Sequence, residues 1–257
     1  MDAWEEIYSA CPSGLAQQLG LSTRRHGQAL FMTSKALDNG QFCNLQGIGL
    51  EGDEDGASIE AGVAAFRAAG TKNFLIQIPP GPKAEAFTER VKKLGLVPFR
   101  RAWTKFERGD APAPRPATAL TIVRAGPVQA ADFGATAVGG FGMPPFLAPW
   151  LGALASLPNW RCYVSYDGSK PVGVGAMRID GDAAWLGVGA TLPEARGKGG
   201  QSGILARRIA DGLAEGVKLF VTETGTAVPG EPQTSFQNIL KSGFEIAYDR
   251  PNWTEPD

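Results

Sequence analysis

The sequence predicts an α/β (α+β) protein built from two related modules, because strand-like and helical segments alternate and their order occurs twice. A proline- and alanine-rich stretch, Gly109–Pro116, has no hydrophobic period and separates the two occurrences. We therefore expect a first module over residues 1–110, a linker over 111–117 and a second module over 118–257. The repetition indicates an internal duplication in which the first copy is shorter.

The second copy is the longer one. Its central helix, expected over 201–215, places Leu205, Ile209 and Leu213 along one face, and Gly216 ends it. The other expected elements are strands over 120–124, 160–166, 171–179, 183–191 and 218–224, helices over 128–138, 146–155 and 235–242, and one or two strands over 244–253.

The first copy repeats the later part of this order. The closing segments correspond, because Lys93-Leu-Gly-Leu occupies the place of Lys241-Ser-Gly-Phe, and Trp103 and Trp253 follow them respectively. The match indicates duplication of one β-α-β-α-β module. The elements expected here are strands over 42–49 and 72–78, helices over 58–69 and 83–94, and a strand region over 96–106.

Composition and charge exclude several classes of protein. With 43% apolar and 20% charged residues, the chain can bury a core and remain soluble. A formal net charge of −1 offers no basic excess for a phosphate backbone, so we expect no nucleic-acid partner. We expect no membrane span, because no apolar run is long enough, and a cytoplasmic location, because the acidic N-terminus is not typical of a signal peptide.

The cysteines and the single histidine form no catalytic or metal-binding pattern. Cys11, Cys43 and Cys162 are far apart and odd in number, so we expect reduced, partly buried thiols. His26 lies in a polar stretch and is expected at the surface. With so few ligands we expect no metal site, and with one histidine we expect no Cys–His or Ser–His pair.

The segment Leu192-Pro-Glu-Ala-Arg-Gly-Lys-Gly-Gly-Gln-Ser202 joins an expected strand to an expected helix. Its glycines permit positive φ and leave backbone N–H groups uncovered. The helix start adds unpaired N–H donors and the positive end of a dipole, and Arg196 and Lys198 add positive charge. Together these features predict an anion cradle that suits a pyrophosphate. The segment matches neither a P-loop nor the dinucleotide-binding fingerprint.

This loop resembles the pyrophosphate loop of the GNAT superfamily of N-acetyltransferases, whose pattern is Arg/Gln-x-x-Gly-x-Gly/Ala between the fourth strand and the third helix. Arg196 and Gly199 match the pattern, whereas Gln201 stands where the family has a small residue. Leu192-Pro-Glu and Lys241-Ser-Gly-Phe also fit the family's layout. The resemblance covers the second module, and the first module resembles only the later part of such a domain.

The resemblance implies a GNAT-like fold for each module, with a mixed, mostly antiparallel central sheet that is truncated in the first. It implies acetyl-CoA or another acyl-CoA as cofactor and direct attack of an amine on the thioester. The fourth strand would hold the pantetheine arm where it splays from the fifth, and the loop would hold the pyrophosphate. The residues so implicated are Val188, Gly189, Ala190, Thr191, Arg196, Gly197, Lys198, Gly199, Gly200, Gln201 and Ser202.

An alkyl amine has a reference pKa of about 10.4, so the acceptor needs a base. Glu223 is the leading candidate, with its neighbouring threonines on the opposite face of the strand; the alternative is a structural or solvent-facing carboxylate. The tyrosine that many GNAT enzymes use as an acid falls at Ile239 here, and Tyr248 is the nearest substitute. Asn238 is a candidate for hydrogen bonding the cofactor or for capping local backbone.

In the first module the corresponding loop, Glu51-Gly-Asp-Glu-Asp-Gly56, carries four carboxylates that would repel a pyrophosphate. We therefore expect no acyl-CoA site there, and a structural role or a role in shaping the acceptor site. For the chain we expect an acetyl-CoA-dependent N-acetyltransferase acting on a primary amine of a small molecule or amino acid. The alternatives are a catalytically silent acyl-CoA-binding or sensor protein and a larger acyl donor. A homodimer is compatible with the sequence, which does not decide the oligomeric state.

Overall fold

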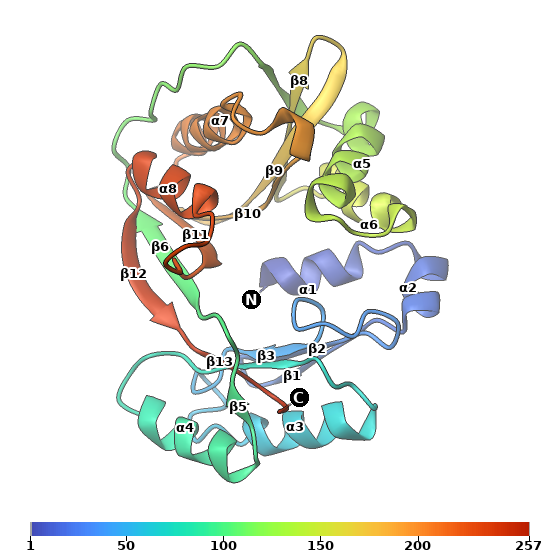
Figure 1. Cartoon of the computed structure of the whole chain (residues 1–257), viewed down its shortest axis with the longest axis vertical. Helices are drawn as coiled ribbons and strands as arrows, with labels where there is room; N and C mark the ends of the chain where they lie inside the picture. The colour runs from blue at the N-terminus through green and yellow to red at the C-terminus, as the bar shows by residue number, and fades with distance from the viewer. Residues whose placement is uncertain (1, 257) are drawn as a thin grey trace. The chain divides into compact units, whose positions relative to one another are not determined.

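The computed structural model describes residues 2–256 and shows a mixed α/β protein with two mostly antiparallel sheets (Figure 1). The chain divides into two compact units. The first contains residues 2–9, Ser13–Thr104 and 248–256, and the second contains Ala10–Pro12 and Lys105–Ala247. The fold class predicted from the sequence is confirmed.

The sheet of the first unit has six strands in the order β1-β2-β3-β4-β13-β5. β3 and β4 pair in parallel, and α3 (Ser58–Ala68) makes the crossover that such a pair needs. The other pairings described in this sheet are antiparallel. The strands are β1 (Ser22–His26), β2 (Ala29–Thr33), β3 (Asn44–Gln46), β4 (Leu75–Gln77), β5 (Val97–Pro98) and β13 (Asn252–Thr254).

Helices cover both faces of this sheet. α3 and α4 (Ala84–Lys93) lie on one face, over a core in which the rings of Phe66 and Phe74 stack 4.6 Å apart (Figure 1). α1 (Asp2–Ser9) and α2 (Ser13–Leu19) lie on the other face. The first module therefore has helices and strands ahead of residue 42, where its first expected strand begins. Sequence patterns do not reveal these two helices or β1 and β2, because the elements are short and β1 is polar and mostly exposed.

The sheet of the second unit has seven strands in the order β12-β6-β11-β10-β9-β8-β7. β10 and β11 pair in parallel around α7 (Gly200–Ala214), and β7 to β10 pair antiparallel. The strands are β6 (Trp103–Arg108), β7 (Thr121–Ala125), β8 (Trp160–Asp167), β9 (Lys170–Asp180), β10 (Ala183–Thr191), β11 (Leu219–Gly225) and β12 (Glu245–Arg250).

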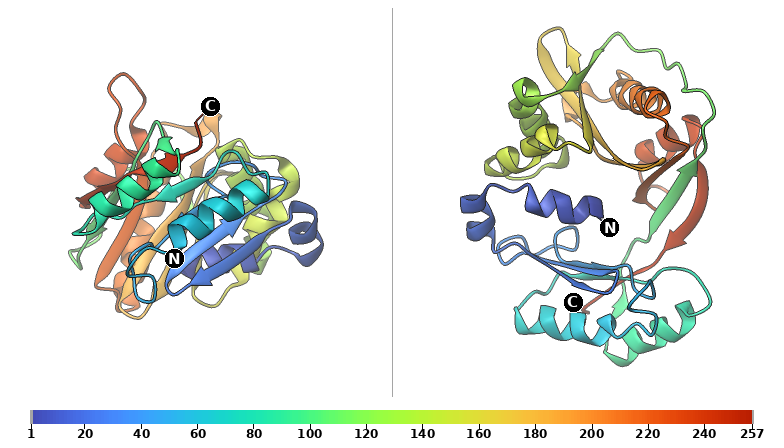
Figure 2. Two further views of the ribbon diagram at one scale, coloured as in Figure 1. Left: turned by 90° about the horizontal axis from the view of Figure 1, so that it is seen from below. Right: turned by 180° about the vertical axis from the view of Figure 1, so that it is seen from behind.

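α7 and α8 (Thr234–Lys241) cover one face of this sheet, and α5 (Ala130–Phe141) and α6 (Ala148–Gly152) cover the other (Figure 2). The helix expected over 146–155 is divided into α6 and two short 3-10 turns, in a segment where prolines remove backbone donors. No helix among residues 2–256 is long and apolar enough to cross a membrane.

In each sheet, one strand lies between two neighbours that are both distant from it in sequence. β13 lies between β4 and β5, where Trp253 is opposite both Ile76 and Pro98. Reciprocally, β6 follows β5 in the chain but lies between β11 and β12. The compact units therefore differ from the expected ranges 1–110 and 118–257, because residues 248–256 belong to the first unit and residues 105–110 to the second.

Candidate functional site

β10 and β11 are paired over only part of their length. The parallel register runs from Ala183–Leu219 to Leu186–Thr222, where the Thr222 hydroxyl donates to the Leu186 carbonyl oxygen at 2.8 Å. No pairing of these two strands beyond Leu186 is found in the described chain. The pairing thus ends just before the residues that the sequence analysis assigned to the pantetheine arm.

β10 is also irregular at this place. Its register with β9 shifts between Gly187 and Ala190, and Val188 has a φ of 49°. Among residues 2–256, Val188 is the only non-glycine residue with positive φ, a conformation that costs on the order of 1–3 kcal/mol. Ala190 and Thr191 pair again with Val174 and Gly173 of β9. The bulge therefore turns the backbone around Val188 out of the regular ladder.

Two side chains hold the backbone immediately before this bulge. The indole of Trp185 lies so close over Gly187 that a Cβ there would be 1.9 Å from it. Arg208, on α7, donates from Nη1 to the carbonyl oxygens of Gly187 at 3.2 Å and Ala176 at 2.8 Å. Neither side chain belongs to a local sequence motif, because only the fold brings the helix and the sheet together at Gly187.

The glycine-rich loop leads from β10 into α7, with Gly199 as the N-cap. Gly197 and Gly199 have φ values of 83° and 79°, in the left-handed region that favours glycine. The N–H groups of residues 200–202 find no hydrogen-bond acceptor in the part of the chain that the structure describes. These three donors lie at the positive end of the α7 dipole, which is an arrangement that favours an anion.

The two cations of the loop differ in their surroundings. Arg196 is exposed, and its guanidinium has no ion-pair or hydrogen-bond partner among the described residues. Lys198 is half-exposed and pairs with Asp167 of β8, with 2.7 Å between Nζ and Oδ2. Arg196 is therefore the loop cation that is available to an incoming phosphate.

Gln201 turns towards the sheet. Its side-chain amide donates to the carbonyl oxygens of Val174 at 2.9 Å and Ala190 at 2.6 Å. A Cβ on the exposed Gly189 would be 3.1 Å from Gln201 Oε1. The large residue that departs from the GNAT pattern therefore ties the start of α7 to β9 and β10, and Ser202 follows it half-buried.

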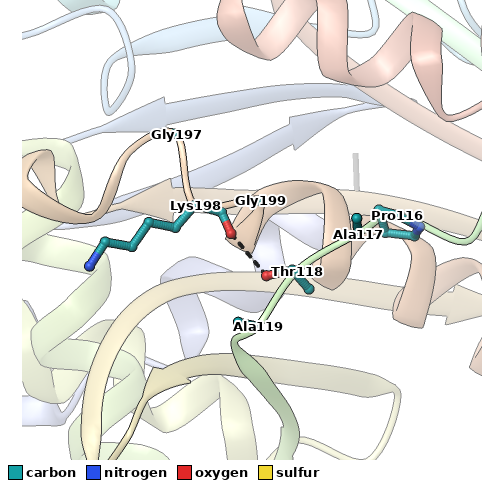
Figure 3. Close-up of a pocket in the computed structure, with 7 residues that line it drawn as sticks. All are labelled: Pro116, Ala117, Thr118, Ala119, Gly197, Lys198 and Gly199. Atoms are coloured by element: carbon teal, nitrogen blue, oxygen red, sulfur yellow. Dashed lines mark hydrogen bonds between the residues drawn. The ribbon is translucent and has the colours of Figure 1, made fainter.

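The last residues of the expected linker and the first residues of the second module lie against the loop. The Thr118 hydroxyl donates to the Lys198 carbonyl oxygen at 2.9 Å, and a Cβ on Gly199 would be 2.8 Å from the Ala117 oxygen. Figure 3 shows the Lys198 side chain pointing away from this contact. Gly199 thus has a packing role besides its φ. An open surface pocket is lined here by Pro116, Ala117, Thr118, Ala119, Gly197, Lys198 and Gly199 (Figure 3).

Glu223 lies on β11, one residue beyond the last pair that joins β11 to β10. Its side chain is mostly buried. Its carboxylate forms an ion pair with the ammonium of Lys105 on β6, and their side chains are 14% and 19% exposed. Thr222 points to the opposite face, where it is buried against β10. Lys105 was expected in the first module, and only the sheet order reveals its place beside Glu223.

The remaining sequence candidates lie on β12 and α8. Tyr248 is on the edge strand β12, is 40% exposed and groups with the first compact unit. Asn238 is half-buried on α8, and its side-chain amide makes no hydrogen bond within the described chain. Its neighbour Ile239, at the position of the family's tyrosine, is buried in the core.

The corresponding loop of the first unit holds a carboxylate of its own. Asp53 is 1% exposed at the start of α3, where its carboxylate accepts hydrogen bonds from the Ser58 N–H at 2.9 Å and the Ser58 hydroxyl at 2.5 Å. It also accepts the Gly49 N–H at 3.4 Å. In a pyrophosphate loop, the N–H groups at the helix start bind an anion. At the start of α3, the Ser58 N–H is already bonded to a carboxylate of the chain itself. His26, half-exposed on β1, lies 3.7 Å from Asp53.

The three cysteines are buried free thiols, and the contact described for the single histidine, His26, is with Asp53. Burial raises the pKa of Cys162 to about 12 and that of Cys11 to about 11, and it also raises the pKa of Cys43. The thiolate form that nucleophilic catalysis needs is therefore disfavoured at all three positions at neutral pH.

No model of a protein family matches the sequence, and no curated protein sequence matches it. Solved structures do match. A GCN5-related N-acetyltransferase from Kribbella flavida superposes with a TM-score of 0.63 at 15% identity, over 98% of this chain and 95% of that one. A GCN5-related N-acetyltransferase from Sphaerobacter thermophilus also has a TM-score of 0.63 at 15% identity, over 88% and 79% of the two chains.

A third match is a GCN5-related glucosamine N-acetyltransferase region of a fungal multi-domain β-N-acetylglucosaminidase. It has a TM-score of 0.60 at 11% identity and covers 91% of this chain and 31% of that one. The likeness extends over both sheets of the present chain. The resemblance found in the sequence is thereby confirmed at the level of the fold, which is that of the GNAT acetyltransferases in a two-module arrangement.

Proposed function

We propose that this chain transfers an acetyl group from acetyl-CoA to a primary amine of a small molecule or amino acid. One observation carries the proposal: β10 leaves β11 at a bulge and then leads, through the glycine-rich loop, into a helix with three unpaired N–H donors. This combination offers one place for a thioester and another for a pyrophosphate on a single continuous segment.

The residues of the loop fit a pyrophosphate in charge and in space. Residues 200–202 supply N–H donors, and the unpaired guanidinium of Arg196 can add two parallel hydrogen bonds. A Cβ on Gly197 would meet no atom within 4 Å, so the loop is open at this point. Backbone groups of residues 188–191 would hold the amides of a pantetheine arm. The Gln201 side chain would fix the start of α7 and would not bind the phosphates, because its amide is hydrogen bonded to the sheet.

Bound acetyl-CoA would supply an acyl group activated as a thioester. The Val188 N–H, displaced from the ladder by the bulge, would donate to the thioester oxygen and stabilise the negative charge that develops there. Glu223 would take one proton from the bound ammonium group and leave a neutral amine. As the amine attacked, the C–N bond would form and the C–S bond would break, and the second proton of the nitrogen would pass through water to the CoA thiolate.

Glu223 is the proposed base because it projects from β11 where β10 departs, on the face opposite Thr222. Lys105 favours the ionised form of its carboxylate, which is the form that accepts a proton. Tyr248, exposed on β12, would not be required as an acid, since water can protonate the thiolate. The first unit is proposed to be a degenerate module without an acyl-CoA site, because Asp53 already satisfies its helix start.

A thiol-release assay tests the proposed reaction. The full-length chain and acetyl-CoA are mixed with amino acids, polyamines, aminoglycosides and glucosamine, the last because one structural relative carries that name. Release of CoA thiol that depends on one amine, together with mass-spectrometric detection of its N-acetyl product, would support the proposal. Binding of acetyl-CoA without turnover on any amine would contradict it.

The Lys105–Glu223 ion pair favours a second candidate, a catalytically silent acyl-CoA-binding protein. A carboxylate held by an ammonium is a weaker base than a free one. Under this alternative, calorimetry would show acetyl-CoA binding whereas no amine would stimulate thiol release.

A further inference from the structure

The side chain of Arg208 is enclosed between α7 and the second sheet, and the residue is 5% exposed. Its two hydrogen bonds, both from Nη1, go to backbone carbonyl oxygens, and its Nε has no acceptor. No carboxylate pairs with it in the described part of the chain. Burial lowers its pKa to about 10, so the guanidinium remains charged at neutral pH.

A buried cation without a counter-ion destabilises a fold, and an apolar side chain of similar volume commonly serves the core better. The second sheet nevertheless provides room for the Arg208 side chain. A Cβ on Gly175 of β9 would be 3.1 Å from Arg208 Cζ, so the missing side chain there leaves space for the guanidinium. Packing alone therefore does not account for Arg208.

The carbonyl that Arg208 contacts belongs to the peptide group that precedes the bulge. The Gly187 C=O and the Val188 N–H are the two ends of one trans peptide, and they point in opposite directions. A positive donor at the carbonyl oxygen polarises the whole group and makes the N–H a stronger donor. The same hydrogen bond fixes the orientation of a residue whose positive φ is intrinsically unfavourable.

We infer that Arg208 is a positioning residue that orients the Gly187–Val188 peptide and strengthens the Val188 N–H as the donor to the thioester oxygen. This inference rests on the proposed function, because it assigns Arg208 to the same acyl-CoA site. Arg208 acts from the α7 side of the sheet through one peptide group and makes no contact with substrate of its own.

Isotope-edited infrared difference spectroscopy of bound acetyl-CoA, labelled with ¹³C at the acetyl carbonyl, tests the inference without any acceptor. A strong N–H donor lowers the carbonyl stretching frequency, so the wild-type protein should shift this band down relative to free acetyl-CoA. Arg208→Met should lose about half of the downshift or more, and should slow thiol release about tenfold with little change in acetyl-CoA affinity. Arg207→Met is the matched control, because Arg207 is the exposed neighbour that pairs with Asp211.

The outcomes separate the two proposals. If the wild-type chain does not bind acetyl-CoA, the proposed function fails and the inference fails with it. If the wild-type chain binds and shifts the band but Arg208→Met shifts it equally, only the inference is overturned. Should Arg208→Met not fold by circular dichroism, Arg208→Lys decides the question. Its ammonium cannot reproduce the guanidinium geometry, so a smaller downshift supports the role and an unchanged one removes it.

Discussion

Gln77 occupies in β4 the position that Glu223 occupies in β11. In each unit the parallel pair ends at an equivalent rung, Leu45–Ile76 in the first and Leu186–Thr222 in the second. The next residue is Gln77 in one unit and Glu223 in the other. An amide cannot accept a proton from an ammonium group at neutral pH, so the first unit lacks the base proposed for the second. The two units thus share a framework and differ in the group that would do the chemistry.

Replacement of the proposed base should separate catalysis from binding. In Glu223→Gln, thiol release should fall about 100-fold, because general-base assistance is lost while the shape of the side chain is kept. Acetyl-CoA affinity, measured by calorimetry, should stay within about threefold of the wild-type value, since the loop is untouched. Glu245→Gln, on the exposed β12, is the control and should retain full turnover. Equal turnover in the two variants would remove Glu223 from the mechanism.

The chain should bind one acetyl-CoA, at the loop of the second unit. Arg196→Ala should raise the acetyl-CoA dissociation constant about tenfold, because a charge-assisted hydrogen bond to phosphate is lost at an exposed site. Arg207→Ala also removes an exposed cation, but one that is committed to Asp211, and it should change the constant little. A calorimetric stoichiometry of two per chain would mean that the first unit binds acetyl-CoA despite Asp53.

Asp53 should contribute to stability and leave acyl-CoA binding unchanged. Asp53→Ala removes the acceptor for the Ser58 N–H and hydroxyl and leaves a buried donor unpaired, so the free energy of unfolding should fall by about 2 kcal/mol. Urea unfolding at pH 7 measures the change. Glu51→Gln alters an exposed carboxylate of the same loop and should have almost no effect. A neutral result for Asp53→Ala would show that the loop does not depend on its internal carboxylate.

Burial of the thiols predicts a loss of stability in alkali. In the folded chain the pKa of Cys162 is raised from its ordinary value of 9.0 to about 12, so only the unfolded chain ionises this thiol between those values. The stability that the protonated thiol provides is therefore fully present below pH 9 and is lost as the pH rises towards 12. Cys162→Ala should lose less stability over this range in urea titrations. A wild-type slope no steeper than that of the variant would contradict the prediction.

The same burial has a practical consequence for the thiol-release assay. At pH 8 the folded chain should not react with an aromatic disulfide reagent, and all three cysteines should react once the chain is unfolded. Thiol detected in the assay should therefore come from CoA alone.

Local signals explain what could be predicted from the sequence. The helix expected over 201–215 is α7, one residue earlier at each end, because its apolar period and the glycines at its two ends are properties of neighbouring residues. The helix expected over 58–69 is α3 for the same reason. The strand over 183–191 was expected at the bounds of β10, since the glycine-rich loop that follows it marks its end.

The features that escaped prediction depend on residues far apart in the chain. Lys105 meets Glu223 only because β6 enters the second sheet, and no local pattern indicates that pairing. In the sequence, Arg208 is one of several charged residues of an amphipathic helix, and only the sheet beneath α7 explains its contact with Gly187. The polar β1 has no apolar alternation to mark it, although it pairs with β2 along its whole length.

The exchange of β6 and β13 makes the two halves of the gene interdependent. During synthesis, the gap between β4 and β5 cannot be filled until residues 252–254 have been made, long after the rest of the first unit. A fragment cut at 111–117 would expose unpaired backbone on both sides of that gap, which invites aggregation. When the two fragments are expressed together, the yield of folded protein should be higher than when either fragment is expressed alone. Recombination that transfers only one half of the gene would then separate a sheet from one of its strands, so the two halves would have to be transferred together.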